Sequence, residues 1–225
     1  MTLLGALFGL LPGFAWLLFY LQEDLHPEPK RLIWITFIAG AASAFFALGF
    51  ELVINNVLTA IGIGYLTAGS LFILAFVEEG MKFAAAYLVV HKNRNFDEPV
   101  DAMIYLVVAS LGFATVENIG ALTGGGVNQL ALASTIFAAT SLRFVGATLL
   151  HTLSSGLVGY AWARGIRDMN LRPHLWAGLA VASALHAIFN YLIINHGSII
   201  YTMVFLLIIG FFVLSDFEKL RRKKI

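Results

Sequence analysis

Long apolar segments dominate the chain and restrict it to helices that cross a membrane. We predict helices over residues 2–21, 32–54, 65–90, 100–122, 129–161, 174–194 and 198–215. A helix needs about 20 apolar residues to cross the hydrocarbon core of a bilayer. Of the 225 residues, 60% are hydrophobic and 12% are charged, whereas about a quarter of the residues in a soluble domain are charged. The sequence therefore predicts an all-α polytopic membrane protein with about seven transmembrane helices.

Composition also excludes several classes of function. The net charge is +1 and the basic residues form no stripe, so we expect no nucleic-acid partner. The chain has no cysteine, which excludes disulfides, thiolate nucleophiles and cysteine-ligated zinc. No connection between the apolar segments is long enough to be a soluble catalytic domain. Residues 1–225 are therefore expected to form a single integral-membrane domain.

The distribution of lysine and arginine predicts the orientation. Twelve of the 14 basic residues fall in alternate connections or in the carboxyl-terminal tail, and these are Lys30, Arg31, Lys92, Arg94, Arg164, Arg167, Arg172, Lys219, Arg221, Arg222, Lys223 and Lys224. Cytoplasmic connections carry an excess of basic residues. We therefore expect an outside amino terminus and a cytoplasmic carboxyl terminus, in the plasma (inner) membrane.

Charged residues inside an apolar helix are functional candidates, because a charge near mid-bilayer costs about 2.5–3.5 kcal/mol on insertion scales. The third segment carries Glu78, Glu79 and Lys82 near its middle. Glu78 and Lys82 are four residues apart and can pair on one helical face. Glu79 is turned about 100° away and needs another partner. Glu51 is expected to lie near the end of its helix and to reach the membrane interface.

Three further helices also bring polar groups into the membrane. The polar residues of these helices are Glu117 and Asn118 in the fourth, Arg143, His151 and Ser155 in the fifth, and His186 and Asn190 in the sixth. A single buried histidine or asparagine is usually a packing hydrogen bond between helices. Four successive helices with such groups instead predict one polar cluster within the bundle, between mid-bilayer and the outer leaflet.

Glutamate and histidine together favour hydrolysis. A glutamate with a nearby histidine can deprotonate water, and a second histidine with an asparagine can stabilise an oxyanion. The chain lacks an H-E-x-x-H helix and a G-x-S-x-G nucleophile turn, and it has no pair of intramembrane aspartates. The set of residues therefore suits cleavage of a peptide bond within the membrane.

The motifs resemble those of the PrsW family of bacterial membrane proteases, within the wider group of glutamate-type intramembrane peptidases. The matching segments are E-E-x-x-K at residues 78–82, F-x-x-x-E at 113–117 followed by Asn118, His151 in the next helix, and H-x-x-x-N at 186–190. They occur in the family's order over about half of the chain, which places the motif core at residues 65–194. A CAAX-type prenyl-protein endopeptidase, a related alternative, typically has E-E-x-x-x-R and F-x-x-x-H. Here Lys82 comes one position earlier and Glu117 replaces the histidine, so the chain looks more like the PrsW branch.

The resemblance implies an intramembrane endopeptidase that makes the site-1 cut in a membrane-anchored anti-sigma factor during a stress response. Glu78 or Glu79 would be the general base for water, assisted by Glu117 or His151. His186 and Asn190 would polarise the carbonyl and hold the oxyanion. Supporting roles fall to Lys82, Asn118 and Arg143.

Three questions stay open at this level. No cofactor is expected, although zinc could be held by Glu79, Glu117, His151 and His186. A proton- or cation-coupled transporter also uses intramembrane Glu and His, but the chain has no inverted repeat. A non-catalytic scaffold with buried ion pairs is the third reading.

Overall fold

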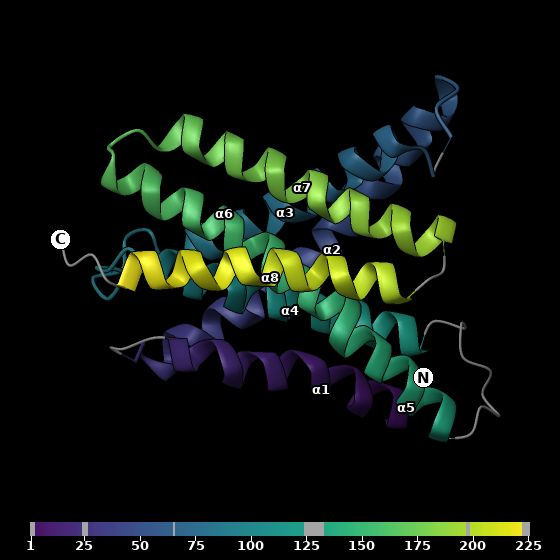
Figure 1. The fold of residues 1–225 in the computed structure, drawn as a ribbon, viewed down its shortest axis with the longest axis horizontal. Helices are drawn as coiled ribbons and strands as arrows, with labels where there is room; N and C mark the ends of the chain where they lie inside the picture. Colours follow the sequence, from purple (N-terminus) through teal and green to yellow (C-terminus); the bar gives the residue numbers. More distant parts are fainter. Residues whose placement is uncertain (1–2, 24–26, 65, 124–132, 197–198, 222–225) are drawn as a thin grey trace.

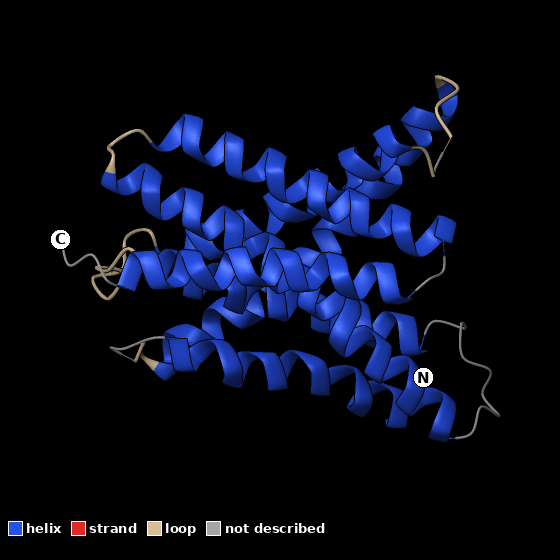
Figure 2. Ribbon diagram, in the orientation of Figure 1, coloured by secondary structure: helices blue, strands red, loops and turns tan. Residues whose placement is uncertain are grey.

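The fold is a bundle of helices (Figures 1 and 2). The computed structural model describes residues 3–23, 27–64, 66–123, 133–196 and 199–221. The elements are α1 (Leu3–Tyr20), η1 (Leu21–Glu23), α2 (Lys30–Ala60), α3 (Ala68–Val90), α4 (Asp101–Thr123), α5 (Ala133–Arg143), η2 (Phe144–Thr148), α6 (Leu149–Arg167), α7 (Leu171–His196) and α8 (Ile199–Arg221). The described residues contain no strand, so the prediction of an all-α membrane protein is confirmed.

The predicted fifth helix is divided in the structure. A five-residue π-helical segment, η2, joins α5 to α6 without a break in the chain of helical residues. Such segments are rare and often lie at functional sites. The predicted start of this helix at residues 129–132, the turn at Gly124–Gly126 and the basic tail from residue 222 lie outside the described residues.

Within the described residues, five helices have the length and composition of a membrane span: α1, α2, α4, α7 and α8. The third helix, α3, does not meet this description because Glu78, Glu79 and Lys82 all fall near its middle. Helix α5 is too short, with 11 residues, and the 19-residue α6 is too polar because it contains His151, Ser154 and Ser155. All three exceptions carry polar residues of the predicted cluster.

Helix α4 is the centre of the bundle, and its residues from Asp101 to Thr115 are all buried. It packs against α1, α2, α3 and α6. Small residues allow the closest approach: a Cβ atom added at Gly112 would lie 2.0 Å from the carbonyl oxygen of Phe37, and one added at Gly40 would lie 1.9 Å from that of Ala109. Close packing of this kind is the usual basis of helix association in membranes.

The second helix is longer than predicted. It continues to Ala60, whereas the sequence indicated a turn over Asn55–Gly64. The residues after Phe50 are mostly apolar and have no Gly or Pro until Gly62, so nothing in this stretch ends the helix. Glu51 consequently lies nine residues before the end of α2, and the expectation that it lies near the end of its helix is wrong.

Candidate active site

The middle of α3 holds a buried charge cluster. Glu79 is 1% exposed and Lys82 is fully buried. The Nζ atom of Lys82 lies 2.8 Å from Oε1 of Glu79 and 3.5 Å from Oε2 of Glu78. Lys82 thus pairs with both glutamates, and more closely with Glu79, because residues three apart also share a helical face. The sequence predicted only the pairing with Glu78.

Glu79 is fully hydrogen-bonded by two other helices. The Ser154 hydroxyl on α6 donates to Oε1 at 2.9 Å, and the Ser155 hydroxyl donates to Oε2 at 3.0 Å. The Nδ1 atom of His186 on α7 lies 3.0 Å from Oε1. A buried carboxylate needs such partners to remain in an apolar interior. Glu79 therefore joins α3 to α6 and α7.

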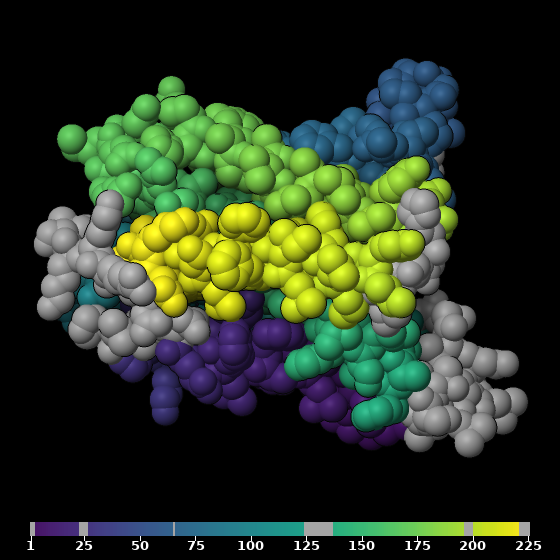
Figure 3. All heavy atoms as spheres, viewed as in Figure 1, coloured from purple at the N-terminus to yellow at the C-terminus, as the bar shows by residue number. Residues whose placement is uncertain are grey.

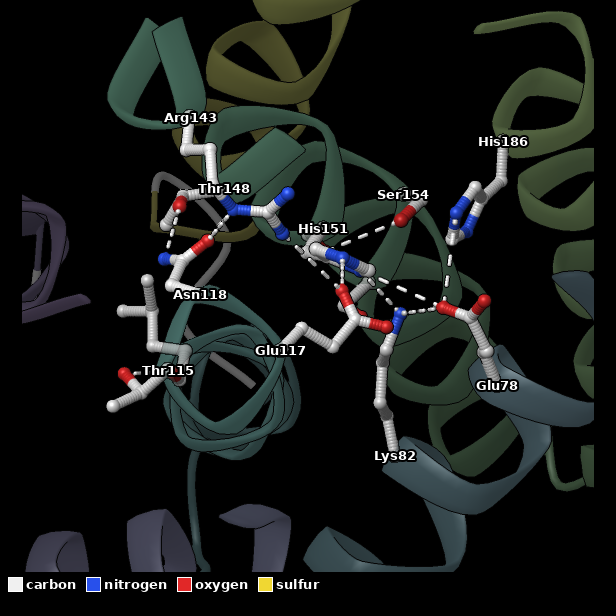
Figure 4. A network of polar contacts seen from close by, with 12 residues as sticks. Glu78, Lys82, Thr115, Glu117, Asn118, Arg143, Thr148, His151, Ser154 and His186 are labelled. Atoms are coloured by element: carbon white, nitrogen blue, oxygen red, sulfur yellow. Dashed lines mark hydrogen bonds and ion pairs between the residues drawn. The ribbon is translucent and has the colours of Figure 1, made fainter. Parts of the chain in front are cut away.

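His151 connects α6 with α3 and α4. Its Nε2 atom lies 2.7 Å from Oε2 of Glu117, and its Nδ1 atom lies 2.7 Å from Nζ of Lys82. Because carboxylates accept and ammonium groups donate, these partners favour the tautomer that carries hydrogen on Nε2. The side chains of this network point toward one another from separate helices (Figure 4).

The outer part of the network is more exposed. The side chains of Glu117 and Arg143 are 33% and 26% exposed, and Nη2 of Arg143 lies 3.9 Å from Oε2 of Glu117. Asn118 accepts a hydrogen bond from Nε of Arg143 and donates one to Thr148 at 2.9 Å. Thr148 is the last residue of η2. The π-helical segment thus lies between two arms of the network, Arg143 and His151.

One buried carboxylate oxygen of the cluster, Oε2 of Glu78, accepts no hydrogen bond from the described residues. That oxygen lies 3.9 Å from Nδ1 of His151 and 3.7 Å from Nε2 of His186. An unsatisfied buried polar atom calls for an explanation such as catalysis, a bound water or an ion.

The same three residues form a possible metal site. Ligand atoms of Glu78, His151 and His186 all lie within 4.8 Å of one another. Two histidines and one carboxylate are a known zinc ligand set that leaves a position for water. Carboxylates on the far ring nitrogens, Glu117 and Glu79, orient both histidines, as is usual for metal-ligating histidine. The donor set therefore fits zinc, provided that Lys82 releases Nδ1 of His151.

Most of the predicted residues come together, but Asn190 stands apart. It lies one turn after His186 on α7 and is only partly buried, and it makes no hydrogen bond within the described part of the cluster. The sequence did not single out Ser154 and Thr148. The sequence did contain a signal for Ser154: it lies three residues after His151 on an otherwise mostly apolar helix, so its hydroxyl shares the histidine's face.

Comparison with known proteins identifies similar chains. The sequence model described as PrsW family intramembrane metalloprotease matches residues 28–215. The chain is 31% identical to Protease PrsW of Geobacillus kaustophilus over 83% of this chain and 78% of the relative. It is 29% identical to Protease PrsW of Bacillus subtilis over 95% of this chain and 94% of that relative. No solved structure matches.

Proposed function

Because the chain belongs to the PrsW family of intramembrane metalloproteases, we propose that it cleaves a membrane-anchored protein at the cluster formed by α3, α4, α6 and α7. Membership of a protease family favours this function over the transporter, scaffold and prenyl-protein alternatives. The match over residues 28–215 is in keeping with one peptidase domain over residues 1–225, whose motif core is residues 65–194. The observation that carries the proposal is the unsatisfied Oε2 atom of Glu78 between two histidines.

In the proposed mechanism Glu78, His151 and His186 hold the attacking water. A proton of the water passes to Glu78, while the water oxygen bonds to the carbonyl carbon of the substrate. The resulting oxyanion accepts hydrogen bonds from Nε2–H of His186 in its imidazolium form, whose Nδ1–H donates to Glu79, and from Asn190 after a change of its side-chain rotamer. When the tetrahedral intermediate collapses, the C–N bond breaks and the proton goes to the leaving amine.

The remaining residues position these groups. Glu79 fixes the ring of His186, and Glu117 fixes the ring of His151. Ser154 and Ser155 hold the carboxylate of Glu79. Lys82 and Arg143 reduce repulsion among the three glutamates. Glu79 is a positioning residue in this scheme because both of its oxygens are already bonded.

Zinc is the metal that the donor set fits, and the family's description as metalloproteases favours its presence. Glu78, His151 and His186 would hold the ion. A bound zinc ion acidifies water and polarises a carbonyl. The expectation of no cofactor is therefore not confirmed. With zinc bound, Glu78 would be a ligand of the ion rather than the base. The metal-free reaction described above, in which Glu78 takes the proton, stays the second candidate because Lys82 is bonded to one of the three ligand atoms.

We further propose that the substrate is a single-pass anti-sigma factor cut on the extracytoplasmic side of the plasma membrane. The resemblance to the PrsW branch supports this substrate, and the basic connections support an orientation with the amino terminus outside. In that orientation α3 runs inward, and the Glu117 end of the network belongs to the outer half of α4.

The experiment is a comparison of new protein amino termini in membranes from cells that express the wild-type chain or Glu78→Gln at equal levels. We expect a new terminus just outside one membrane span that occurs only with the wild type. It would identify the substrate and the cut bond together. If both membranes give the same termini while both proteins are folded and the stress signal is supplied, the protease function is overturned.

A further inference from the structure

The inner face of α2 carries two polar residues that the catalytic scheme does not use. Between Leu48 and Val53, Glu51 alone is turned away from the surface. It continues the buried stripe of Ala44 and Ala47 at helical spacing. Asn55 lies one turn beyond Glu51 on the same face and is also only partly exposed. The two side chains therefore point into the protein rather than into lipid.

Neither side chain is satisfied by the protein itself. The Oδ1 atom of Asn55 is buried without a hydrogen-bond partner within the described ranges. Glu51 likewise forms no hydrogen bond or ion pair with any described residue. Buried polar atoms without partners, such as Oδ1 of Asn55, are rare in native proteins. Glu51 on the preceding turn is only partly buried, so both side chains are free to bond with another molecule.

This face of α2 adjoins the proposed active site. Ala44 and Ala47 pack against Phe113 of α4. The same Phe113 ring lies 4.6 Å from Nζ of Lys82 and 5.8 Å, between ring centroids, from His151. Glu51, one turn beyond Ala47, interacts electrostatically with Glu78, Glu117 and Lys82. Glu51 and Asn55 thus lie on the face of α2 that packs beside the proposed active site.

The far end of α2 and the start of α3 project beyond the other helices (Figure 3). The last turns of α2 have exposed apolar side chains on their other faces, among them Phe50, Val53 and Val57. A substrate helix that approaches through lipid therefore meets an apolar surface first. Its backbone meets polar partners only on the inner face, where Glu51 and Asn55 lie.

A peptide bond must leave its helix before water can attack it. Once the segment is extended, its N–H and C=O groups lose their helical partners, and each unpaired group costs several kcal/mol inside a bilayer. A carboxylate accepts hydrogen bonds from N–H groups, and a side-chain amide both donates and accepts. Glu51 and Asn55 have the chemistry and the position to replace the lost bonds.

We propose that Glu51 and Asn55 form a binding site for the extended backbone of the substrate beside the cut bond. The inference rests on the proposed peptidase function and adds a substrate-binding residue pair to it. It assigns to α2 the binding of the unwound segment, whereas α3, α6 and α7 supply the chemistry.

The test uses a synthetic single-span peptide that carries the mapped cut site, with the enzyme in lipid nanodiscs. In turn, an ester replaces each backbone amide around the cut bond, which removes one N–H donor. We expect at least one ester to lower kcat/KM of the wild type about tenfold, as loss of a hydrogen bond to a charged group does. The same ester should have little further effect in Glu51→Leu or Asn55→Leu.

Controls separate this inference from the proposed function and from misfolding. Asp97→Asn removes an exposed carboxylate in the α3–α4 connection, and its response to every ester should equal that of the wild type. If each ester has the same effect in the wild type and both leucine variants, the inference is overturned although the protease stands. A wild-type enzyme that does not cut the unmodified peptide counts against the proposed function itself.

A second readout does not depend on turnover. The chain has no cysteine, so Asn55→Cys combined with Glu78→Gln can be cross-linked to one cysteine near the cut site of the peptide. Phe46→Cys is the matched control, because nine residues at about 100° each put Phe46 on the opposite face of α2. We expect a disulfide with Asn55→Cys and little with Phe46→Cys. Equal cross-linking at the two positions would contradict the proposal.

Discussion

Glu79 and His186 are 107 residues apart in the sequence, yet Oε1 of Glu79 lies 3.0 Å from Nδ1 of His186. This contact leaves Nε2 of His186 directed to the neighbouring Glu78, at 3.7 Å from Oε2. Two adjacent glutamates thus differ in their surroundings: Glu79 is hydrogen-bonded at both oxygens, whereas Oε2 of Glu78 has no hydrogen bond from any described residue. The difference explains why we assign chemistry to Glu78 and positioning to Glu79.

Exchange of the two glutamates for glutamine should therefore have different effects. Glu78→Gln should lower cleavage at least about 1000-fold, in line with the loss of a general base or metal ligand. Its thermal unfolding should stay near that of the wild type. Glu79→Gln should lower both cleavage and the free energy of unfolding, the latter by about 3 kcal/mol, because Lys82 loses its closest partner. Cleavage assays and thermal melts of purified protein check this, and equal melting of the two variants would contradict it.

Lys82 is expected to be a stabilising residue for the whole cluster. Lys82→Met leaves Glu79 as a buried charge without its cation, and this should cost about 3–5 kcal/mol of unfolding free energy. The double variant Lys82→Met, Glu79→Gln should be destabilised by less than the sum of the single changes, because the residues are in contact. A double-mutant cycle from denaturation curves measures the coupling, and additive losses would refute it.

Metal analysis of the purified protein should find about one zinc ion per chain. His186→Ala should lose the ion, since it removes one of three ligands. Removal of the ion by a chelator should stop cleavage, and added zinc should restore it. Fully active protein without metal would instead leave Glu78 as the base of a glutamate-type reaction.

Replacement of a glycine by alanine should have opposite effects at Gly112, where α4 contacts α2, and at Gly80, whose Cβ position is open. Gly112→Ala puts a Cβ atom 2.0 Å from the carbonyl oxygen of Phe37, so we expect a loss of about 2 kcal/mol in unfolding free energy. Gly80→Ala in α3 is the matched control, because nothing lies within 4 Å of its Cβ position. It should stabilise the helix by up to about 1 kcal/mol. Melting temperatures of both variants, measured in the same detergent, decide the matter.

Reporter fusions test the orientation. We expect alkaline phosphatase to be active when fused after Gly64, in the α2–α3 connection, and inactive when fused after Phe96, in the α3–α4 connection. The second connection carries Lys92 and Arg94, whereas the first has no basic residue. The reverse result would place the Glu117 end of the network in the cytoplasmic half and exclude an extracytoplasmic cut.

Much of the fold could be predicted because the bilayer constrains it. The apolar lengths identified the seven helical units, with the largest errors at the ends of α2, α6 and α8, each of which continues six residues beyond its predicted end. The π-helical turn at Phe144–Thr148 was not predictable, since its sequence has no Pro and continues an apolar helix. Likewise, no local signal told Glu78 from Glu79.

Sequence alone determined that the chain is helical, that it belongs in a membrane, and which ionisable residues carry a free-energy cost in the bilayer that a function must offset. These conclusions follow from residue type and spacing, which act locally along each helix. Only the tertiary structure decided which partner each residue meets. The packing of α3 against α6 and α7 brings Ser154, Ser155 and His186 to Glu79. The same packing leaves Oε2 of Glu78 and Oδ1 of Asn55 without a hydrogen bond from any described residue, because distances between helices depend on how their surfaces fit together.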